Sequence, residues 1–128
     1  MSSRSVTITL VNTTNLTLML TSTSLAHGTW QTAPPATVGK KATWEAVSDG
    51  FATGVQGFVV YQIGSAAGQA QGAAPAPNAP PTPAVTLNFD NPYVGSDDFS
   101  AAPSAGFNCA VTSNAGNDAQ VTYTLSAA

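Results

Sequence analysis

The chain has 128 residues, and only 7% of them are charged, against roughly 25% in typical soluble domains. The net charge is −3 and the only cations are Arg4, Lys40 and Lys41, which are too few to neutralise a row of phosphates, so nucleic acid is not an expected partner. The length predicts one domain over residues 1–128, the single cysteine Cys109 excludes an intramolecular disulfide, and no apolar run approaches the roughly 18 residues of a membrane-spanning helix.

The N-terminal part alternates threonine with apolar residues. The segments "VTITLV" at 6–11 and "NLTLMLTS" at 15–22 place Val, Ile or Leu at every second position, which predicts two strands joined as a hairpin across an Asn-Thr-Thr-Asn turn. Asn12 and Asn15 match the N-glycosylation pattern, but the N-terminal residues do not show the pattern of a signal peptide, so we expect both asparagines to form the turn. Without that signal we expect a cytoplasmic protein, or one released by a non-classical route that acts at a target membrane.

The middle of the chain combines turn residues with a strongly apolar run. The segment "QTAPPATVGKK" at 31–41 contains paired prolines and a glycine, which predicts a loop across one edge of the fold, followed by a short strand around Trp44. The run from Phe58 to Ile63 is apolar enough for a central strand that is buried on both faces. Gly54 and Gly57 precede or begin this strand, and we expect them at a bulge or a close backbone approach.

An Ala/Pro-rich segment separates this region from the last strands. Residues 65–84 show no hydrophobic periodicity and predict a flexible loop. Three alternating runs follow, at 85–89, 106–112 and 119–125, and "NAGND" at 114–118 is typical of a hairpin turn. About seven short strands with no helical periodicity predict an all-β fold, an antiparallel two-sheet β-sandwich with little or no helix.

Few side chains of this sequence are suited to catalysis. His27 lies in "LAHGTW" and is expected in a turn or loop, whereas Cys109 lies in the alternating run "GFNCAV" and is expected to pack as a small apolar side chain. No motif pairs a base with an orienting group, so we expect no enzyme and no cofactor.

The segment "NFDNPYVGSDDF" at 88–99 concentrates half of the chain's carboxylates. Calcium favours clustered carboxylates such as Asp90, Asp97 and Asp98, but the spacing of an EF-hand loop is absent. Turn formation, with Gly95 at a positive φ angle, is the preferred interpretation, and we expect no metal site.

Three aromatic residues lie near Pro or Gly in predicted connections: Trp30, Tyr93 and Phe99. Exposed aromatic side chains on loops usually mark recognition surfaces. The alternative for each ring is that it folds back and closes one end of the sandwich.

The order of these motifs resembles the actinoporin-like β-sandwich cytolysins, together with the aegerolysins and related bacterial and fungal crystal-type toxins. The resemblance lies in "ATGVQGFVVYQI" at 52–63, "VTLNFDNPY" at 85–93 and the final hairpin "NAGNDAQVTYTL" at 114–125. In actinoporins the loop after the matching strand helps to bind the sphingomyelin headgroup. That resemblance implies roles for Asp90, Pro92 and Tyr93, with Gln56 at the neighbouring strand position. The pore-forming N-terminal helix and the tyrosine cluster of actinoporins have no counterpart here.

These absences favour the aegerolysin branch, whose members are small, acidic, lipid-binding proteins that often act with a larger perforating partner. We therefore expect a non-enzymatic lipid-binding protein of cytolysin or toxin type that recognises a sphingolipid-type headgroup. Its expected ligand-binding residues are Asp90, Pro92, Tyr93, Gln56, Trp30 and Phe99.

Two alternatives to lipid binding stay open at this stage. A carbohydrate-binding lectin on the same fold would recognise a glycan by aromatic stacking and neutral hydrogen bonds. A self-assembling structural protein, a homo-oligomer, is the second alternative, because low charge does little to oppose association at edge strands.

Overall fold

Strands form almost all of the computed structural model, which describes residues 4–48, 54–64, 83–92, 97–114 and 118–128. These ranges contain no helix, and hence none with the length and apolarity needed to cross a membrane. Their strands are, in chain order, β1 Ser5–Asn12, β2 Leu18–His27, β3 Thr29–Thr32, β4 Thr37–Val38, β5 Lys41–Val47, β6 Val55–Ile63, β7 Ala84–Asn91, β8 Asp98–Pro103, β9 Phe107–Asn114 and β10 Asp118–Ala127.

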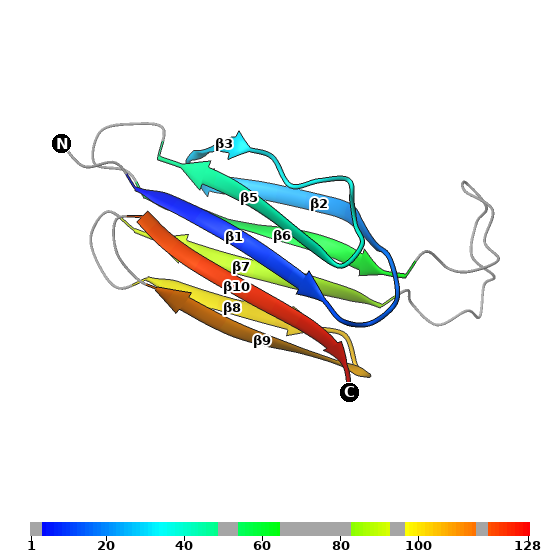
Figure 1. The fold of residues 1–128 in the computed structure, drawn as a ribbon. Coiled ribbons are helices and arrows are strands. Elements are labelled where there is room, and N and C mark those ends of the chain that lie inside the picture. The colour runs from blue at the N-terminus through cyan, green and yellow to red at the C-terminus, as the bar shows by residue number, and fades with distance from the viewer. Residues whose placement is uncertain (1–3, 49–53, 65–82, 93–96, 115–117) are drawn as a thin grey trace.

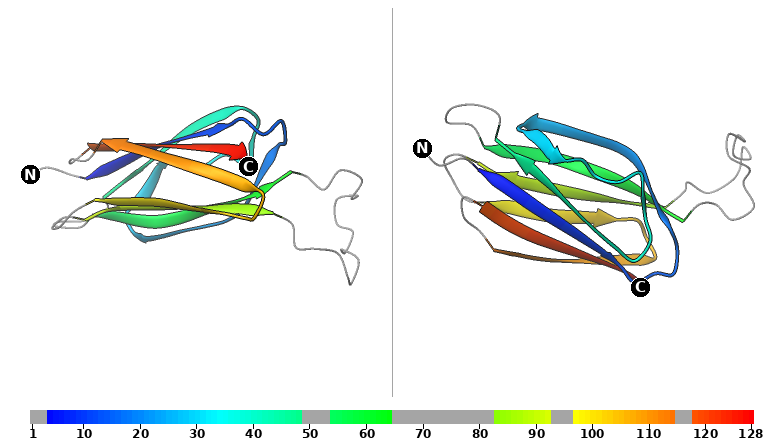
Figure 2. Two further views of the ribbon diagram at one scale, coloured as in Figure 1. Left: turned by 90° about the horizontal axis from the view of Figure 1, so that it is seen from below. Right: turned by 45° about the horizontal axis from the view of Figure 1, so that its top comes forward.

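The strands form two five-stranded sheets that pack face to face (Figures 1 and 2). Sheet A has the order β3-β5-β1-β10-β9, and sheet B has the order β4-β2-β6-β7-β8. All pairs are antiparallel except β1 with β10, which run parallel in the middle of sheet A. The predicted all-β sandwich is confirmed, with one parallel pair that local sequence patterns did not indicate.

The alternating apolar residues of both sheets meet in one core. On β1 the side chains of Val6, Ile8 and Leu10 are fully buried, as the alternation predicted. The two buried tyrosines also find hydrogen-bond acceptors: the Tyr61 hydroxyl donates to Pro35 O at 2.7 Å and the Tyr123 hydroxyl donates to Asn88 O. Burial raises the pKa of both tyrosines well above its usual range, so the hydroxyls stay protonated donors.

The predicted opening hairpin is wrong, because β1 and β2 lie in different sheets. Strand β1 pairs with β5 and β10, whereas β2 pairs with β4 and β6. Strand β1 buries Val6, Ile8 and Leu10, whereas β2 buries Leu18 against the same core from the opposite sheet and its later residues are partly buried or exposed. Periodicity defines the buried face of a strand and leaves its partner undefined.

The expected role of Asn12 in the turn is confirmed. Its side chain is 5% exposed, and Nδ2 donates to Leu16 O and to Gly39 O, while Oδ1 accepts from Thr14 N. Asn15 has a φ of 67°, a left-handed conformation that asparagine tolerates better than most residues. These hydrogen bonds stabilise the turn in which the chain passes from sheet A to sheet B.

Strand β6 is central in sheet B, as predicted, but its expected burial on both faces is wrong. Phe58 is 37% exposed and Val60 is half-buried, because nothing in the described residues covers the outer face of sheet B at these positions. The expected close approach at Gly57 is confirmed, since a Cβ atom there would lie 2.2 Å from Ser24 O.

The placement of Trp30 and Phe99 in connections is wrong, since they lie in β3 and β8. Strand β8 escaped prediction because its sequence, "DFSAAP", is short and rich in small residues. The segment 31–41, expected to be a loop, also contains the short strand β4. The pairing of β9 with β10 is confirmed, whereas the turn residues 115–117 and most of the predicted flexible loop, 65–82, lie outside the described residues.

Candidate functional site

Four polar side chains form a row across the outer face of sheet B, at the end of the sandwich where β7 ends and β8 begins. From one strand to the next they are His27 on β2, Gln56 on β6, Asp90 on β7 and Asp98 on β8. Each residue lies opposite the next on the neighbouring strand. Three of the four are exposed, and Asp90 is half-buried. Because adjacent strands are about 4.8 Å apart, this polar row spans roughly 14 Å.

A bulge in β2 places His27 in the row. Leu25 lies opposite Gly57 and His27 lies opposite Gln56, so β2 contains one extra residue, Ala26, between these pairs. The missing side chain of Gly57 allows the β2 backbone to approach closely at this point. His27, expected in a turn or loop, is therefore the exposed last residue of a strand.

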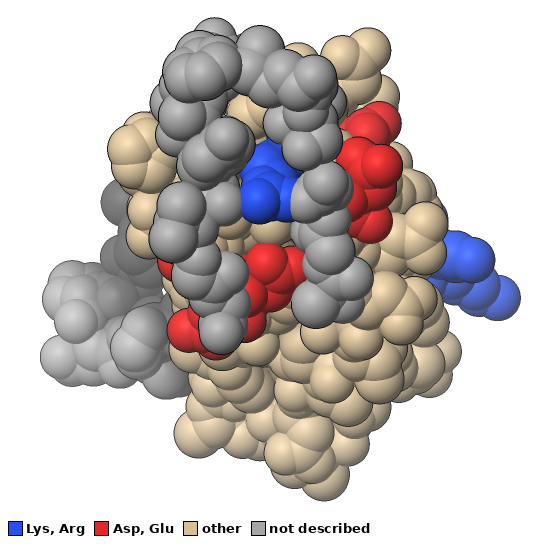
Figure 3. All heavy atoms as spheres, turned by 90° about the vertical axis from the view of Figure 1, so that its left-hand side faces the viewer, with Lys and Arg blue, Asp and Glu red and all other residues tan. Residues whose placement is uncertain are grey.

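The row is rich in negative charge. Partial burial is the main cause that raises the pKa of Asp90, followed by the carboxylates of Asp98 and Asp97, while His27 acts in the opposite direction. Seen end-on, acidic side chains lie at this end of the molecule, with basic side-chain atoms between them (Figure 3). A group of adjacent carboxylates favours a ligand that brings positive charge or hydroxyl donors.

Aromatic side chains close the core directly beneath the row. The rings of Trp30 and Phe89 lie 5.9 Å apart at 59°, and Phe99 pairs with Phe89 across β7 and β8. Trp30 and Phe99 are both half-buried and pack against the core. For these two residues the alternative of a ring that closes the end of the sandwich is confirmed.

A polar link between the sheets holds this end together. Asn91, which is 1% exposed, donates from Nδ2 to Ser5 O at 3.0 Å, across from sheet B to sheet A. Ser5 Oγ donates in turn to Asp118 Oδ1 at 2.8 Å. The end of β7, and with it Asp90, is therefore fixed against β1 and β10.

The structure divides the expected ligand residues into groups. Gln56 and Asp90 are cross-strand neighbours, as the resemblance implied. Trp30 and Phe99 lie on the core side of the sheets, away from that pair, and Pro92 is half-buried directly after β7. Tyr93 lies outside the described residues.

Sequence reasoning overlooked two members of the row, His27 and Asp98. Asp98 was assigned to a turn because β8 was not recognised, although its alternation with half-buried Phe99 and Ala101 was a weak signal. Within the described ranges no three His, Cys, Asp or Glu side chains are grouped so that they could hold a metal ion.

No protein-family model and no curated protein matches this chain. Solved structures do match it. The lipid binding protein Nakanori superposes with a TM-score of 0.71 at 11% identity, over 95% of this chain and 70% of that one. The lectin XCL from Xerocomus chrysenteron superposes with a TM-score of 0.60 at 10% identity, over 96% of this chain and 99% of that one. The shared property is the sandwich fold.

Proposed function

We propose that this protein binds a lipid headgroup at the polar row and catalyses no reaction. The observation that carries the proposal is the row itself, a set of four hydrogen-bonding side chains in register on a chain with only 7% charged residues. The fold shared with a lipid binding protein supports it.

The acidic character of the row narrows the headgroup. Asp90 and Asp98 repel phosphate that carries no compensating cation, and the net charge of −3 adds to this repulsion. A zwitterionic headgroup such as phosphocholine supplies both a cation for the carboxylates and an acceptor for the amide. Its ammonium group lies against Asp90, and its phosphate accepts a hydrogen bond from the Gln56 amide. A sphingolipid-type lipid offers this headgroup together with further hydroxyl and amide donors.

The remaining expected residues take supporting roles. Pro92 and Tyr93 follow directly after Asp90 and Asn91, and we assign them to contact with the membrane interface, where amphipathic rings are stable. Trp30 and Phe99 support the row from the core side through Phe89. Action as a cytolysin or toxin at a target membrane, with a larger perforating partner, is the most specific form of the proposal and rests on the sequence resemblance.

Glycan binding is the second candidate function. Carboxylate and amide oxygens are also acceptors for sugar hydroxyls, and a lectin shares the fold. The outer face of sheet A adds further hydroxyl groups, for example Thr9 Oγ1 and Thr43 Oγ1 at 3.2 Å.

Sedimentation with vesicles of sphingomyelin, phosphatidylcholine or phosphatidylserine tests the proposal, and a glycan array tests the second candidate. We expect binding to the choline lipids, and a loss of about fivefold to tenfold in Gln56→Ala, as for one hydrogen bond of about 1–1.5 kcal/mol. Gln62→Ala is the matched control, because Gln62 lies on the same face of β6, six residues away at the other end of the strand. Lipid binding is refuted if no vesicle binds, and the location of the site is refuted if both variants lose affinity equally.

A further inference from the structure

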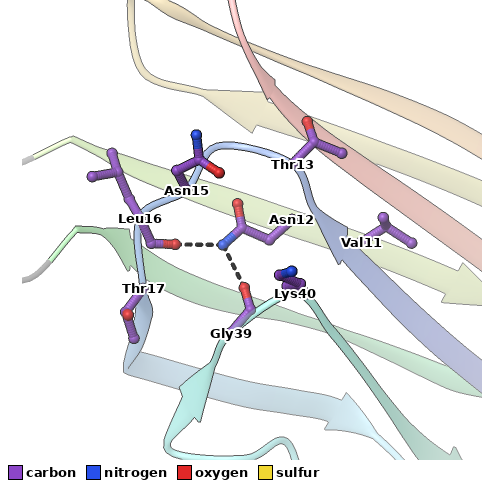
Figure 4. Close-up of a pocket in the computed structure, with 8 residues that line it drawn as sticks. All are labelled: Val11, Asn12, Thr13, Asn15, Leu16, Thr17, Gly39 and Lys40. Carbon is purple, nitrogen blue, oxygen red and sulfur yellow. Dashed lines mark hydrogen bonds between the residues drawn. The ribbon is translucent and has the colours of Figure 1, made fainter.

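A second candidate site lies at the opposite end of the sandwich from the polar row. The turn between β1 and β2 and the turn between β4 and β5 surround a pocket of about 550 Å³ (Figure 4). This volume falls within the roughly 300–1,000 Å³ of small-molecule pockets. The pocket residues are Val11, Asn12, Thr13, Asn15, Leu16, Thr17, Gly39 and Lys40.

Hydrogen bonds of Asn12 and Thr13 hold the walls of this pocket in place. Asn12 Nδ2 bridges the two turns by donating to Leu16 O and, at 2.7 Å, to Gly39 O (Figure 4). The backbone N–H of Asn12 donates to Lys40 O at 2.8 Å, and the side-chain hydroxyl of Thr13 donates from Oγ1 to Leu125 O at 2.9 Å. The two walls are therefore held in place by hydrogen bonds within the protein.

Lys40 is the only charged residue among the described residues that line the pocket. The acidic end of the molecule is remote: Asp118 lies opposite Ser5 at the start of β1, whereas the pocket begins at Asn12, at the end of β1. Seven strand steps of about 3.3 Å separate these points by roughly 23 Å. That separation exceeds the Debye length of about 8 Å at physiological ionic strength, so the carboxylates at that end do not cancel the positive potential of Lys40.

Polar donors and an apolar surface adjoin this cation. The exposed side chains of Asn15 and Thr17 line the pocket and contribute an amide and a hydroxyl. Leu16 is 44% exposed and is one of two large apolar side chains exposed in the described part of the chain. Val11, a second apolar residue of the pocket lining, is half-buried. A cation, neutral donors and exposed apolar surface occur together here.

We propose that this pocket binds a small amphiphilic anion, a phosphate or carboxylate group on a short alkyl chain. The anionic group lies against Lys40 and accepts from Asn15 and Thr17, and the alkyl chain covers Leu16. The site is separate from the polar row, so this proposal does not depend on lipid or glycan binding there.

Titration of the ¹⁵N-labelled protein with hexyl phosphate, followed by amide chemical shifts, tests the proposal. We expect saturable shifts at residues 11–17, 39 and 40. Lys40→Gln should weaken binding by about tenfold or more, as for the loss of a charge-assisted hydrogen bond. Lys41→Gln, the adjacent lysine outside the pocket lining, is the matched control and should bind normally.

A second variant introduces repulsion without removing a native side chain. A Cβ atom at Gly39 would meet nothing within 4 Å, so Gly39→Asp places a carboxylate near Lys40 without a clash at that atom. We expect this variant to bind hexyl phosphate at least about tenfold more weakly, with a spectrum as well dispersed as that of the wild type.

Four outcomes would overturn the proposal. Inorganic phosphate that binds as tightly as hexyl phosphate would show that the alkyl chain contributes nothing, and 1-hexanol that binds as tightly would show the same for the charge. Absence of saturable shifts at the pocket is the third. The fourth is Lys40-dependent binding to phosphatidic acid vesicles without binding of hexyl phosphate, which would make this end a membrane contact.

Discussion

Replacement of Gly57 by alanine is the most incisive test of how the polar row is built. Gly57 lies opposite Leu25, directly before the extra residue Ala26 that brings His27 beside Gln56. An alanine Cβ would lie 2.2 Å from Ser24 O and 2.9 Å from Leu25 Cδ2. The first of these atoms belongs to the backbone, so β2 must move away from β6.

The expected cost follows from this clash. Overpacking of a filled site costs about 1–3 kcal/mol, and displacement of a strand backbone belongs in the upper part of that range, so we expect a loss of about 2–3 kcal/mol in the free energy of unfolding. The entropy of unfolding is about 2.1 cal/mol/K per residue, which for 128 residues gives about 0.27 kcal/mol/K. Tm should therefore fall by about 7–11 °C.

Thermal unfolding followed by circular dichroism measures this change. Gly39→Ala is the matched control, because its Cβ meets nothing within 4 Å, and its stability should stay within about 1 kcal/mol of the wild type. Gly57→Ala should also weaken any ligand that contacts both His27 and Gln56. Equal Tm values for the two variants would refute the argument that the glycine permits the bulge.

Two further predictions concern titratable groups. Because partial burial, Asp98 and Asp97 raise the pKa of Asp90 above its unfolded value, its ionisation opposes folding, and the stability it contributes falls as pH rises through the folded pKa. Asp90→Asn should therefore raise Tm at pH 7. Near pH 3 the Asp90 side chain is itself uncharged, so the variant should show no such gain there. Calorimetry at both pH values measures the two differences, and a larger gain near pH 3 would contradict the prediction. Burial raises the pKa of the Cys109 thiol from 9.0 to about 11, so iodoacetamide at pH 8 should react about a hundredfold more slowly with the folded protein than with the urea-unfolded protein, and equal rates would contradict the burial.

Only part of the candidate site was accessible from the sequence, because the polar row runs across four strands. Alternation in "VTLNF" places Phe89 in the core, and this position is confirmed. Asp90 was expected in a turn after this strand, and that expectation is wrong, because β7 continues to Asn91. The adjacency of Gln56 and Asp90, implied by the resemblance, is confirmed as well. His27 and Asp98 could not be assigned, because one depends on a bulge and the other on an edge strand with small side chains.

The sequence by itself determined that the chain is all-β and which side of the alternating strands, such as β1, is buried. Those properties follow from a period of two residues, which is local and survives any choice of partner. The tertiary structure alone decided which strands are partners: β1 lies parallel to β10 in one sheet, and β2 lies beside β6 in the other. Residues more than 100 positions apart, such as Ser5 and Asp118, become neighbours through this choice. It depends on how both sheets cover one core, and that requirement is expressed by the whole chain and by no single segment.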